Sequence, residues 1–242
     1  MAFASLVALI GLAWLYLWFD AARMHAMPMG TAPPDAGAMT ATSGQLVLTF
    51  LMWSVMMVGM MLPSAMPAIL LYASMAGGNR GFALSAAWVF TAGYLVVWIG
   101  FSLAASVLQV GLASAALLTP MMASASAWLS GGLLIAAGVY QWVPVKDVCL
   151  EKCRAPLQFF LFNWRPGLAG AFRMGVKHGG FCVGCCWILM LILFAVGVMN
   201  LLWVALIAGF VLAEKLLPGG RLVGRTAGIA LAAAGGYLIA AG

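Results

Sequence analysis

The amino-acid sequence predicts an all-α protein, a polytopic transmembrane helix bundle of about seven spans. Of the 242 residues, 66% are hydrophobic and 7% are charged. A soluble domain carries about 25% charged residues, because its surface must be hydrated. The length allows roughly six to eight spanning helices of about 20 residues each. No stretch is polar enough for a separate soluble domain, so residues 1–242 are expected to form a single integral membrane domain.

Seven hydrophobic stretches predict the spans in chain order. They cover residues 3–19, 45–72, 82–110, 122–142, 181–198, 201–217 and 222–241. No basic residue precedes the first stretch, which favours a true span over a signal peptide. The second contains Pro63 and Pro67. Proline lacks the backbone N–H of other residues, so this span is expected to bend and to leave a carbonyl that needs another donor.

The basic residues predict the orientation of these spans. With a cytoplasmic N-terminus, the inner segments hold ten of the eleven Lys and Arg residues, and the outer segments hold only Arg23. Such an excess is typical of cytoplasmic loops. We therefore expect the C-terminus outside, in the inner membrane of a bacterial-type cell. The net charge of +6 is explained by this bias, so it predicts no nucleic-acid partner.

Two connecting segments are longer than turns require. Residues 20–44 predict an outer loop rich in Met, Pro and Gly, and residues 143–178 predict a basic cytoplasmic segment. Within the second segment, residues 156–164 predict a short helix at the membrane interface, where aromatic and basic side chains are favourable. One boundary stays open, because the fifth span either begins at Phe181 or extends back to Gly167.

Enzymatic chemistry is not favoured by the motifs of the chain. The sequence contains no nucleotide-binding or hydrolase motif, and its five acidic residues are too scattered for paired-carboxylate catalysis. Glu214 and Lys215 lie near the inner end of the sixth span. They are either a functional charge or a pair anchored at the interface, and the interfacial pair is the favoured interpretation.

The first candidate site combines histidine with cysteine. His178, Cys182, Cys185 and Cys186 share one face if this segment is helical. One imidazole and two or three thiols form a soft donor set, which favours Cu(I) and also allows zinc. In the alternative interpretation, the cysteines pack as small apolar residues and the nearby histidine is coincidental.

A second thiol pair lies on the same predicted side of the membrane. Cys149 and Cys153 are spaced by four residues, so they could share a metal ion or exchange disulfides with the first group. Lys146, Lys152 and Arg154 lie close by in the sequence and would favour the thiolate form. A structural disulfide is not expected in a reducing cytoplasm.

Methionine forms two further candidate groups. The outer group lies in the predicted outer loop and consists of Met24, His25, Met27 and Met29. Thioethers without cysteine suit a soft metal in an oxidising compartment. The second group is a stripe along the second span and consists of Met56, Met57, Met60 and Met61. Such a stripe could line a path for a soft ion, although packing in the core or against lipid explains the spacing more often.

Several of these motifs resemble a known family. The run from Met56 to Pro67, MMVGMMLPSAMP, is similar to the signature of domain-of-unknown-function family 2182, described as predicted metal-binding integral membrane proteins. Further matches are DVCLEKCR at 147–154, WRPG at 164–167, MG at 174–175, HG at 178–179, CVGCCW at 182–187, MNL at 199–201 and EK at 214–215. The resemblance extends over residues 45–218. It implies that the Met, Cys and His groups bind a metal, without naming the metal.

These patterns predict a membrane protein that binds a soft metal ion, most simply Cu(I), in copper transport, chaperoning or cuproenzyme assembly. A cuproenzyme or a periplasmic metal carrier is the expected partner, beside the lipid bilayer, and a homo- or hetero-oligomer is an open option. Affinity rising from thioether to thiolate would favour inward movement without a motor. Two alternatives remain, a membrane thiol–disulfide carrier and an accessory structural subunit of a larger membrane complex.

Overall fold

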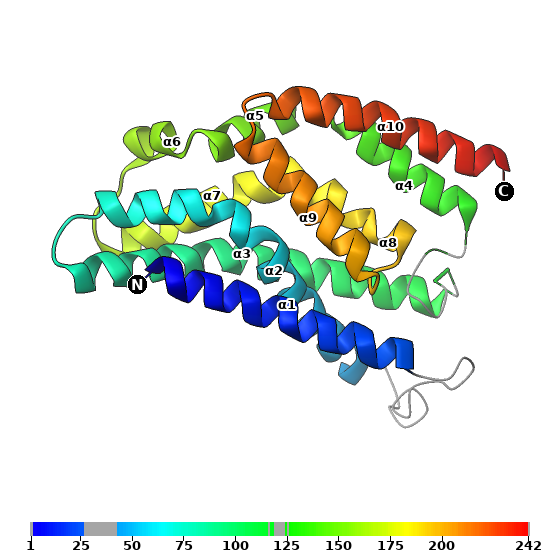
Figure 1. Ribbon diagram of the computed structural model, residues 1–242, viewed down its shortest axis with the longest axis horizontal. Coiled ribbons are helices and arrows are strands. Elements are labelled where there is room, and N and C mark those ends of the chain that lie inside the picture. The colour runs from blue at the N-terminus through cyan, green and yellow to red at the C-terminus, as the bar shows by residue number, and fades with distance from the viewer. Residues whose placement is uncertain (1, 27–42, 116, 119–123, 125, 242) are drawn as a thin grey trace.

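The computed structural model describes residues 2–26, 43–115, 117–118, 124 and 126–241, and every regular element in these ranges is an α-helix. The helices are α1 (Ala2–Ala26), α2 (Ser43–Met75), α3 (Arg80–Ser114), α4 (Ala127–Tyr140), α5 (Pro144–Arg154), α6 (Pro156–Asn163), α7 (Gly167–Leu191), α8 (Leu193–Val196), α9 (Leu201–Leu216) and α10 (Gly220–Ala241). Most of them follow the long axis of the molecule, and the two chain ends lie at opposite ends of that axis (Figure 1). The prediction of an all-α fold is confirmed.

Five segments are long and apolar enough to cross a membrane. They are Ala2–Arg23, Gly44–Met75, Arg80–Ser114, Gly167–Val196 and Gly220–Ala241. The pair α4 and α5 also passes this test when taken together, but it is bent by 66°. α9 has 16 residues, fewer than the 20 or so that usually span a bilayer. These helices support the prediction of a membrane protein. By length and composition, however, five to six segments of the described chain can cross a membrane, which is fewer than the seven predicted.

The structure defines two helix boundaries that bear on the candidate sites. α1 continues to Ala26 rather than ending at residue 19, so Met24 and His25 belong to its last turn. α7 begins at Gly167, which settles the open boundary: the histidine and cysteines lie on one continuous helix with its basic first turns. Hydropathy placed the end of the first span too early because it penalises charged residues such as Arg23, although the long stem of arginine can run along apolar surface. The expected short helix is present as α6.

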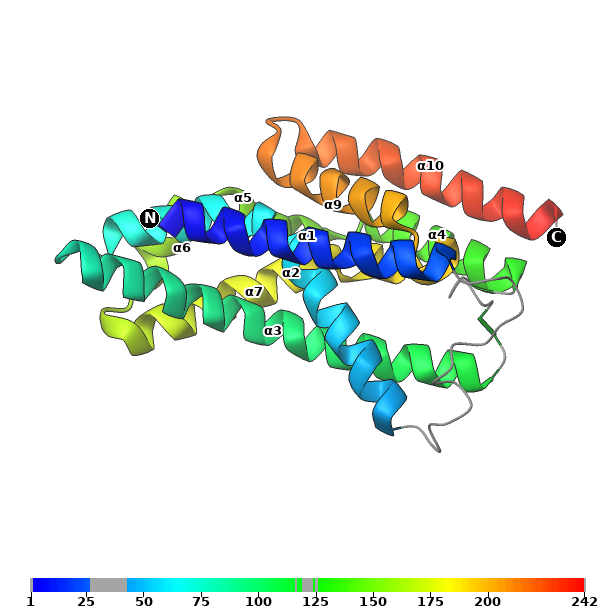
Figure 2. The ribbon, with the colours of Figure 1, turned by 60° about the horizontal axis from the view of Figure 1, so that its bottom comes forward.

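The bend in α2 follows from its prolines. Figure 2 shows α2 changing direction near its middle. Pro63 has no N–H to donate to the carbonyl of Gly59, four residues earlier in the helix. The indole Nε1 of Trp14 on α1 donates to this freed carbonyl at 3.2 Å. The expectation that another donor must satisfy the carbonyl is confirmed, and the bond ties α1 to the bent part of α2.

Glycines bring α3 and α7 into backbone contact. A Cβ atom added at Gly175 would collide with the carbonyl oxygen of Phe90, and one at Gly93 would collide with that of Phe172. Any larger residue at these positions would therefore push the helices apart. This close packing carries Tyr94 of α3 to the cysteines of α7, where the candidate site lies.

Candidate functional site

Four of the five thiols gather around Cys182 in the core of the bundle. The side chain of Cys182 on α7 is fully buried. The thiols of Cys185 and Cys186 donate to its backbone carbonyl at 3.1 and 2.9 Å, and the thiol of Cys153 on α5 lies beside its thiol. All five cysteines, including half-buried Cys149, are free thiols. The predicted meeting of the two cysteine groups therefore occurs through Cys153.

A buried lysine faces the central thiol. The ammonium Nζ of Lys215 on α9 lies 3.0 Å from the Cys182 sulfur and donates to the Ser64 hydroxyl of α2 at 2.9 Å. The Tyr94 hydroxyl lies 3.0 Å from the same sulfur and donates to the Met61 carbonyl at 3.1 Å. None of the ion pairs among the described residues involves Lys215. A cation beside a thiol stabilises the thiolate, which is the form that binds metals.

The methionine stripe of α2 is buried, so it faces the bundle rather than lipid. Each of its four residues has at most 1% of its surface exposed. Met61 reaches the thiol cluster, since the Cys186 thiol lies 3.9 Å from its thioether sulfur. Farther along α2, Met52 and Met56 line a small hollow of about 10 Å³ together with Met199, which precedes α9. The sequence interpretation missed Met199, although the MNL motif contains it.

His178 is buried one turn before Cys182 and is packed among aromatic rings. Its ring centroid lies 5.5 Å from that of Phe159, 6.0 Å from Phe90 and 6.1 Å from Tyr94. Its Nδ1 atom is buried without a hydrogen-bond partner in the described part of the chain. Buried polar atoms nearly always have a partner. An unused ring nitrogen next to the thiol cluster is therefore a candidate ligand atom.

A comparison with models of known protein families identifies the family of this chain. Residues 50–238 match the model of the PpoB2 family, whose description is copper chaperone. The chain belongs to the PpoB2 family. No curated protein and no solved structure matches it.

Membership of the PpoB2 family supports the copper-related part of the sequence prediction. It does not support the family-2182 name suggested by the motifs. The matched residues begin within α2 and end within α10, and they include every thiol and buried methionine of the candidate site. They exclude Met24, His25, Met27 and Met29. For this outer group the structure describes no side chain, so its role in metal capture stays a prediction.

The donor set of this PpoB2 protein fits Cu(I) better than zinc. In the described part of the chain, no three side chains of His, Cys, Asp or Glu are placed to hold one metal ion. A structural zinc site needs four such ligands, so the structure gives the zinc alternative no support. Cu(I) accepts as few as two soft donors, and thiolates and thioethers select it. Sulfur atoms that satisfy this need are present at Cys182, Cys186 and Met61.

The favoured interpretation of Glu214 and Lys215 is wrong. Both side chains are buried rather than anchored at a surface, and they do not pair with each other. Consecutive helical residues point about 100° apart. Glu214 therefore faces away from the thiols and pairs with Lys146 of α5 at 2.6 Å, and Lys146 also donates to Gln141. Gly224 of α10 leaves room for the Glu214 carboxylate, with which an added Cβ would collide.

Two of the three cations expected to act on Cys149 and Cys153 have other partners. Lys146 is held by Glu214, and Arg154 donates to the carbonyls of Leu217 and Pro218 at 2.6 and 2.8 Å. The cation at the thiols comes instead from Lys215, 33 residues after Cys182 in the chain. Cys149 lies against Gly184 of α7, where an added Cβ would come within 2.8 Å of its sulfur.

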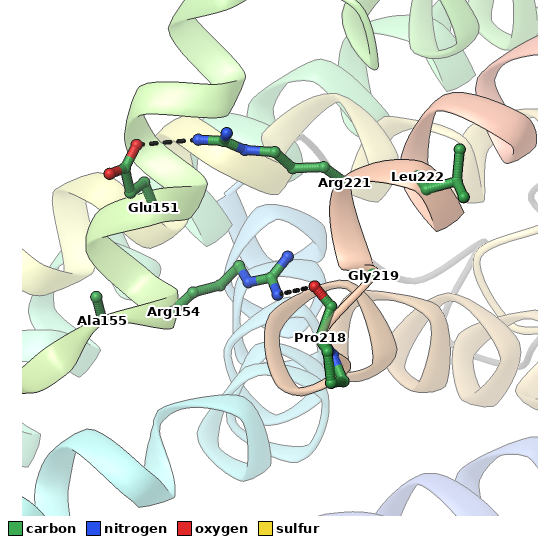
Figure 3. A pocket seen from close by; sticks show the side chains of 7 residues that line it. All are labelled: Glu151, Arg154, Ala155, Pro218, Gly219, Arg221 and Leu222. Carbon is green, nitrogen blue, oxygen red and sulfur yellow. Dashed lines mark hydrogen bonds and ion pairs between the residues drawn. The ribbon is translucent and has the colours of Figure 1, made fainter.

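A larger hollow lies outside the thiol cluster, at the turn between α9 and α10 (Figure 3). It has a volume of about 480 Å³ and is lined mainly by α5 and that turn. Arg221 points to Glu151, with 2.9 Å between Nη2 and Oε2, and Arg154 points to the Pro218 carbonyl. The residues that line it include no cysteine, histidine or methionine, so this hollow has no soft donor for copper.

Proposed function

We propose that this protein is a membrane-embedded copper chaperone that holds Cu(I) with Cys182 and neighbouring sulfur atoms. The observation that carries the proposal is the contact of Cys182 with Lys215 inside a buried cluster of thiols. Cys186 and Met61, whose sulfur atoms lie 3.9 Å apart, supply further sulfur donors, and His178 supplies an unused ring nitrogen. PpoB2 family membership supports copper as the cargo.

The charges of this site are balanced when Cu(I) is bound. Cu(I) carries one positive charge, and two thiolates that hold it carry two negative charges, so the loaded pair has a net charge of −1. The Lys215 ammonium beside Cys182 brings the total to zero. A buried charge is costly unless it is compensated. Lys215 therefore makes a copper dithiolate tolerable in the core, and binding to neutral thiols releases protons.

Methionines in the first half of α2 offer copper a route to the thiols. The hollow beside Met52, Met56 and Met199 presents thioethers, which bind Cu(I) without deprotonation. Met61, past the bend, contacts Cys186. Copper would pass from thioethers to thiols, with Met24, His25, Met27 and Met29 as a collecting group before them. A cuproenzyme or a soluble metal carrier would exchange copper with the chain.

We further propose seven crossings with a cytoplasmic N-terminus in a bacterial-type inner membrane. The opposite placement of the two chain ends supports an odd number of crossings (Figure 1). The short helices α4 and α9 would add two crossings to the five long segments. A reporter enzyme fused after Gly242 should be found on the outer side of the membrane. Activity on the cytoplasmic side would contradict this topology.

The copper content of the purified protein tests the proposal. Wild-type protein, purified in detergent under reducing conditions and supplied with Cu(I), should retain copper after desalting, as measured by mass spectrometry. Cys182→Ser should lose it. Cys149→Ser is the matched control, because Cys149 is half-buried and no described contact joins it to Cys182. Equal copper in wild type and Cys182→Ser would contradict the proposal.

Thiol exchange is a second candidate, and one observation favours it. The thiols of Cys153 on α5 and Cys182 on α7 lie beside each other, and both are free. A carrier would cycle this pair through a disulfide with an external thiol–disulfide partner. Trapping thiols in growing cells distinguishes the two functions. A fraction of the protein with Cys153 and Cys182 oxidised would favour exchange, and fully reduced protein under all growth conditions would remove it.

A further inference from the structure

A third hollow lies where α6 meets α7, and most of the residues that line it are basic or polar. It has a volume of about 350 Å³ and is lined by Asn163, Arg165, Arg173, Met174 and Lys177. Three of these five residues carry a positive charge, and none carries a negative charge. The copper proposal assigns no role to any of them.

The turn between the two helices shapes this hollow. Gly167 has a φ of 76°, which reverses the chain after α6. An atom larger than hydrogen at Gly170 would collide with the Arg165 backbone, so the turn lies directly on α7. The backbone N–H of Arg165 donates to the Met174 sulfur at 3.4 Å, and the Lys177 ammonium donates to the Asn163 side chain. These bonds hold basic residues from both sides of the turn around one space.

The cations of this hollow differ from those in Figure 3. In the hollow at the α9–α10 turn, Arg221 pairs with Glu151 (Figure 3). Arg221 also pairs with Asp147, so carboxylates already neutralise its guanidinium. Among the described residues, no ion pair involves Arg165, Arg173 or Lys177. A concave site with three uncompensated cations attracts an anion, and guanidinium groups match phosphate oxygens in geometry.

The surroundings indicate where that anion comes from. Beside the hollow, α6 exposes the apolar side chains of Leu161 and Phe162, the latter with 86% of its surface exposed. Exposed apolar and aromatic residues next to cations are typical of the membrane interface. α7 has 25 residues and is about 37 Å long, which exceeds the roughly 30 Å core of a bilayer. Its basic first turns therefore reach headgroup depth.

We propose that this hollow binds the phosphate of an anionic phospholipid headgroup. Arg165 and Arg173 supply the guanidinium donors, Lys177 supplies an ammonium, and the exposed apolar residues of α6 lie among the lipid chains. Basic pockets at the cytoplasmic side of membrane proteins recognise such headgroups. The bound lipid would fix the α6–α7 turn at the membrane surface. The inference does not depend on copper binding.

Native mass spectrometry of the full chain in detergent tests this site with phosphatidylglycerol and phosphatidylcholine as probes. Each basic residue near a membrane surface changes anionic-lipid binding about fivefold, so Arg173→Gln/Lys177→Gln should weaken phosphatidylglycerol binding about thirtyfold. Phosphatidylcholine binding should not change. Arg221→Gln removes an arginine from the other hollow and should keep wild-type phosphatidylglycerol binding. Arg173→Lys/Lys177→Arg keeps both charges and should also keep it.

Three results would overturn the proposal. The Gln pair could bind phosphatidylglycerol as wild type does, or Arg221→Gln could lose as much binding as the pair. Millimolar inorganic phosphate could displace phosphatidylglycerol completely, which would assign the site to free phosphate. Copper content measured on the same samples separates loss of the site from loss of the fold, because the thiol cluster lies elsewhere on α7.

Discussion

The two buried lysines of this protein have different partners. Lys146 of α5 is neutralised by the Glu214 carboxylate at 2.6 Å, with 2% of each side chain exposed. Lys215, which follows Glu214 on α9, forms no ion pair with any described carboxylate and contacts the Cys182 sulfur and the Ser64 hydroxyl. α9 therefore carries the carboxylate of a buried ion pair and, one residue later, a cation whose partner is a buried thiol.

The comparison indicates which charge is structural and which is functional. A carboxylate and an ammonium already neutralise each other, so the Lys146–Glu214 pair needs no further ligand. A thiol is neutral when protonated and negative when it binds copper, so Lys215 is matched only when Cys182 has lost its proton. The first pair joins α5 to α9, and in the proposed function the second prepares the site for Cu(I).

Breaking the structural pair should have the largest effect on stability. Lys146→Met leaves Glu214 buried without its cation, and loss of one partner of a buried pair lowers the free energy of unfolding by about 3–5 kcal/mol. Denaturant unfolding in detergent measures this loss. The double variant Lys146→Met/Glu214→Leu removes both charges and should recover most of the stability. A double variant as unstable as the single one would show that the pair itself is not the cause.

Removing the functional cation should act on copper more than on stability. Lys215→Met leaves Cys182 a neutral thiol in the empty protein, but the copper dithiolate loses its compensating charge. Groups that support metal ligands change metal affinity about 10–100-fold, and we expect a loss in this range. Competition with a Cu(I) chelator measures the affinity. The double variant Lys146→Met/Glu214→Leu should keep wild-type affinity, and an equal loss there would end the distinction between the two lysines.

A smaller effect is expected at the thioether that contacts the cluster. Met61→Leu keeps the volume of the side chain, so its cost to stability should stay below about 1.5 kcal/mol. It removes one sulfur donor near Cys186 and should weaken copper binding less than Lys215→Met does. Met57→Leu, at a buried position of the same stripe, is the matched control and should bind copper normally. Equal losses at Met57 and Met61 would mean that the stripe acts as a whole.

The sequence predicted the helices far better than it predicted their contacts. Hydropathy located the apolar helices, and Pro63 predicted the bend of α2 and the unsatisfied carbonyl that Trp14 binds. The cysteine spacing on α7 predicted which thiols share a face. It could not reveal that Tyr94, 88 residues away, and Lys215, 33 residues away, contact Cys182. Such contacts depend on which helices pack together, and here glycines such as Gly175 decide that.

The residues that the sequence does not assign correctly were missed for one physical reason. Glu214 and Lys215 were interpreted as an interfacial pair because charges near the end of an apolar helix usually reach water. Burial of both depends on partners from α5, α2 and α7, which the local sequence does not contain. Met199 was missed for the same reason, since its hollow forms only when α1, α2 and α9 meet.

X-ray absorption at the copper edge tests the central claim, that Cys182 and its sulfur neighbours hold Cu(I), most directly. Full-length protein loaded with Cu(I) under reducing conditions should show a first coordination shell dominated by sulfur. The same measurement on Cys182→Ser should show little bound copper, while Cys149→Ser should reproduce the wild-type spectrum. A first shell of oxygen and nitrogen alone, or a spectrum unchanged in Cys182→Ser, would contradict the account.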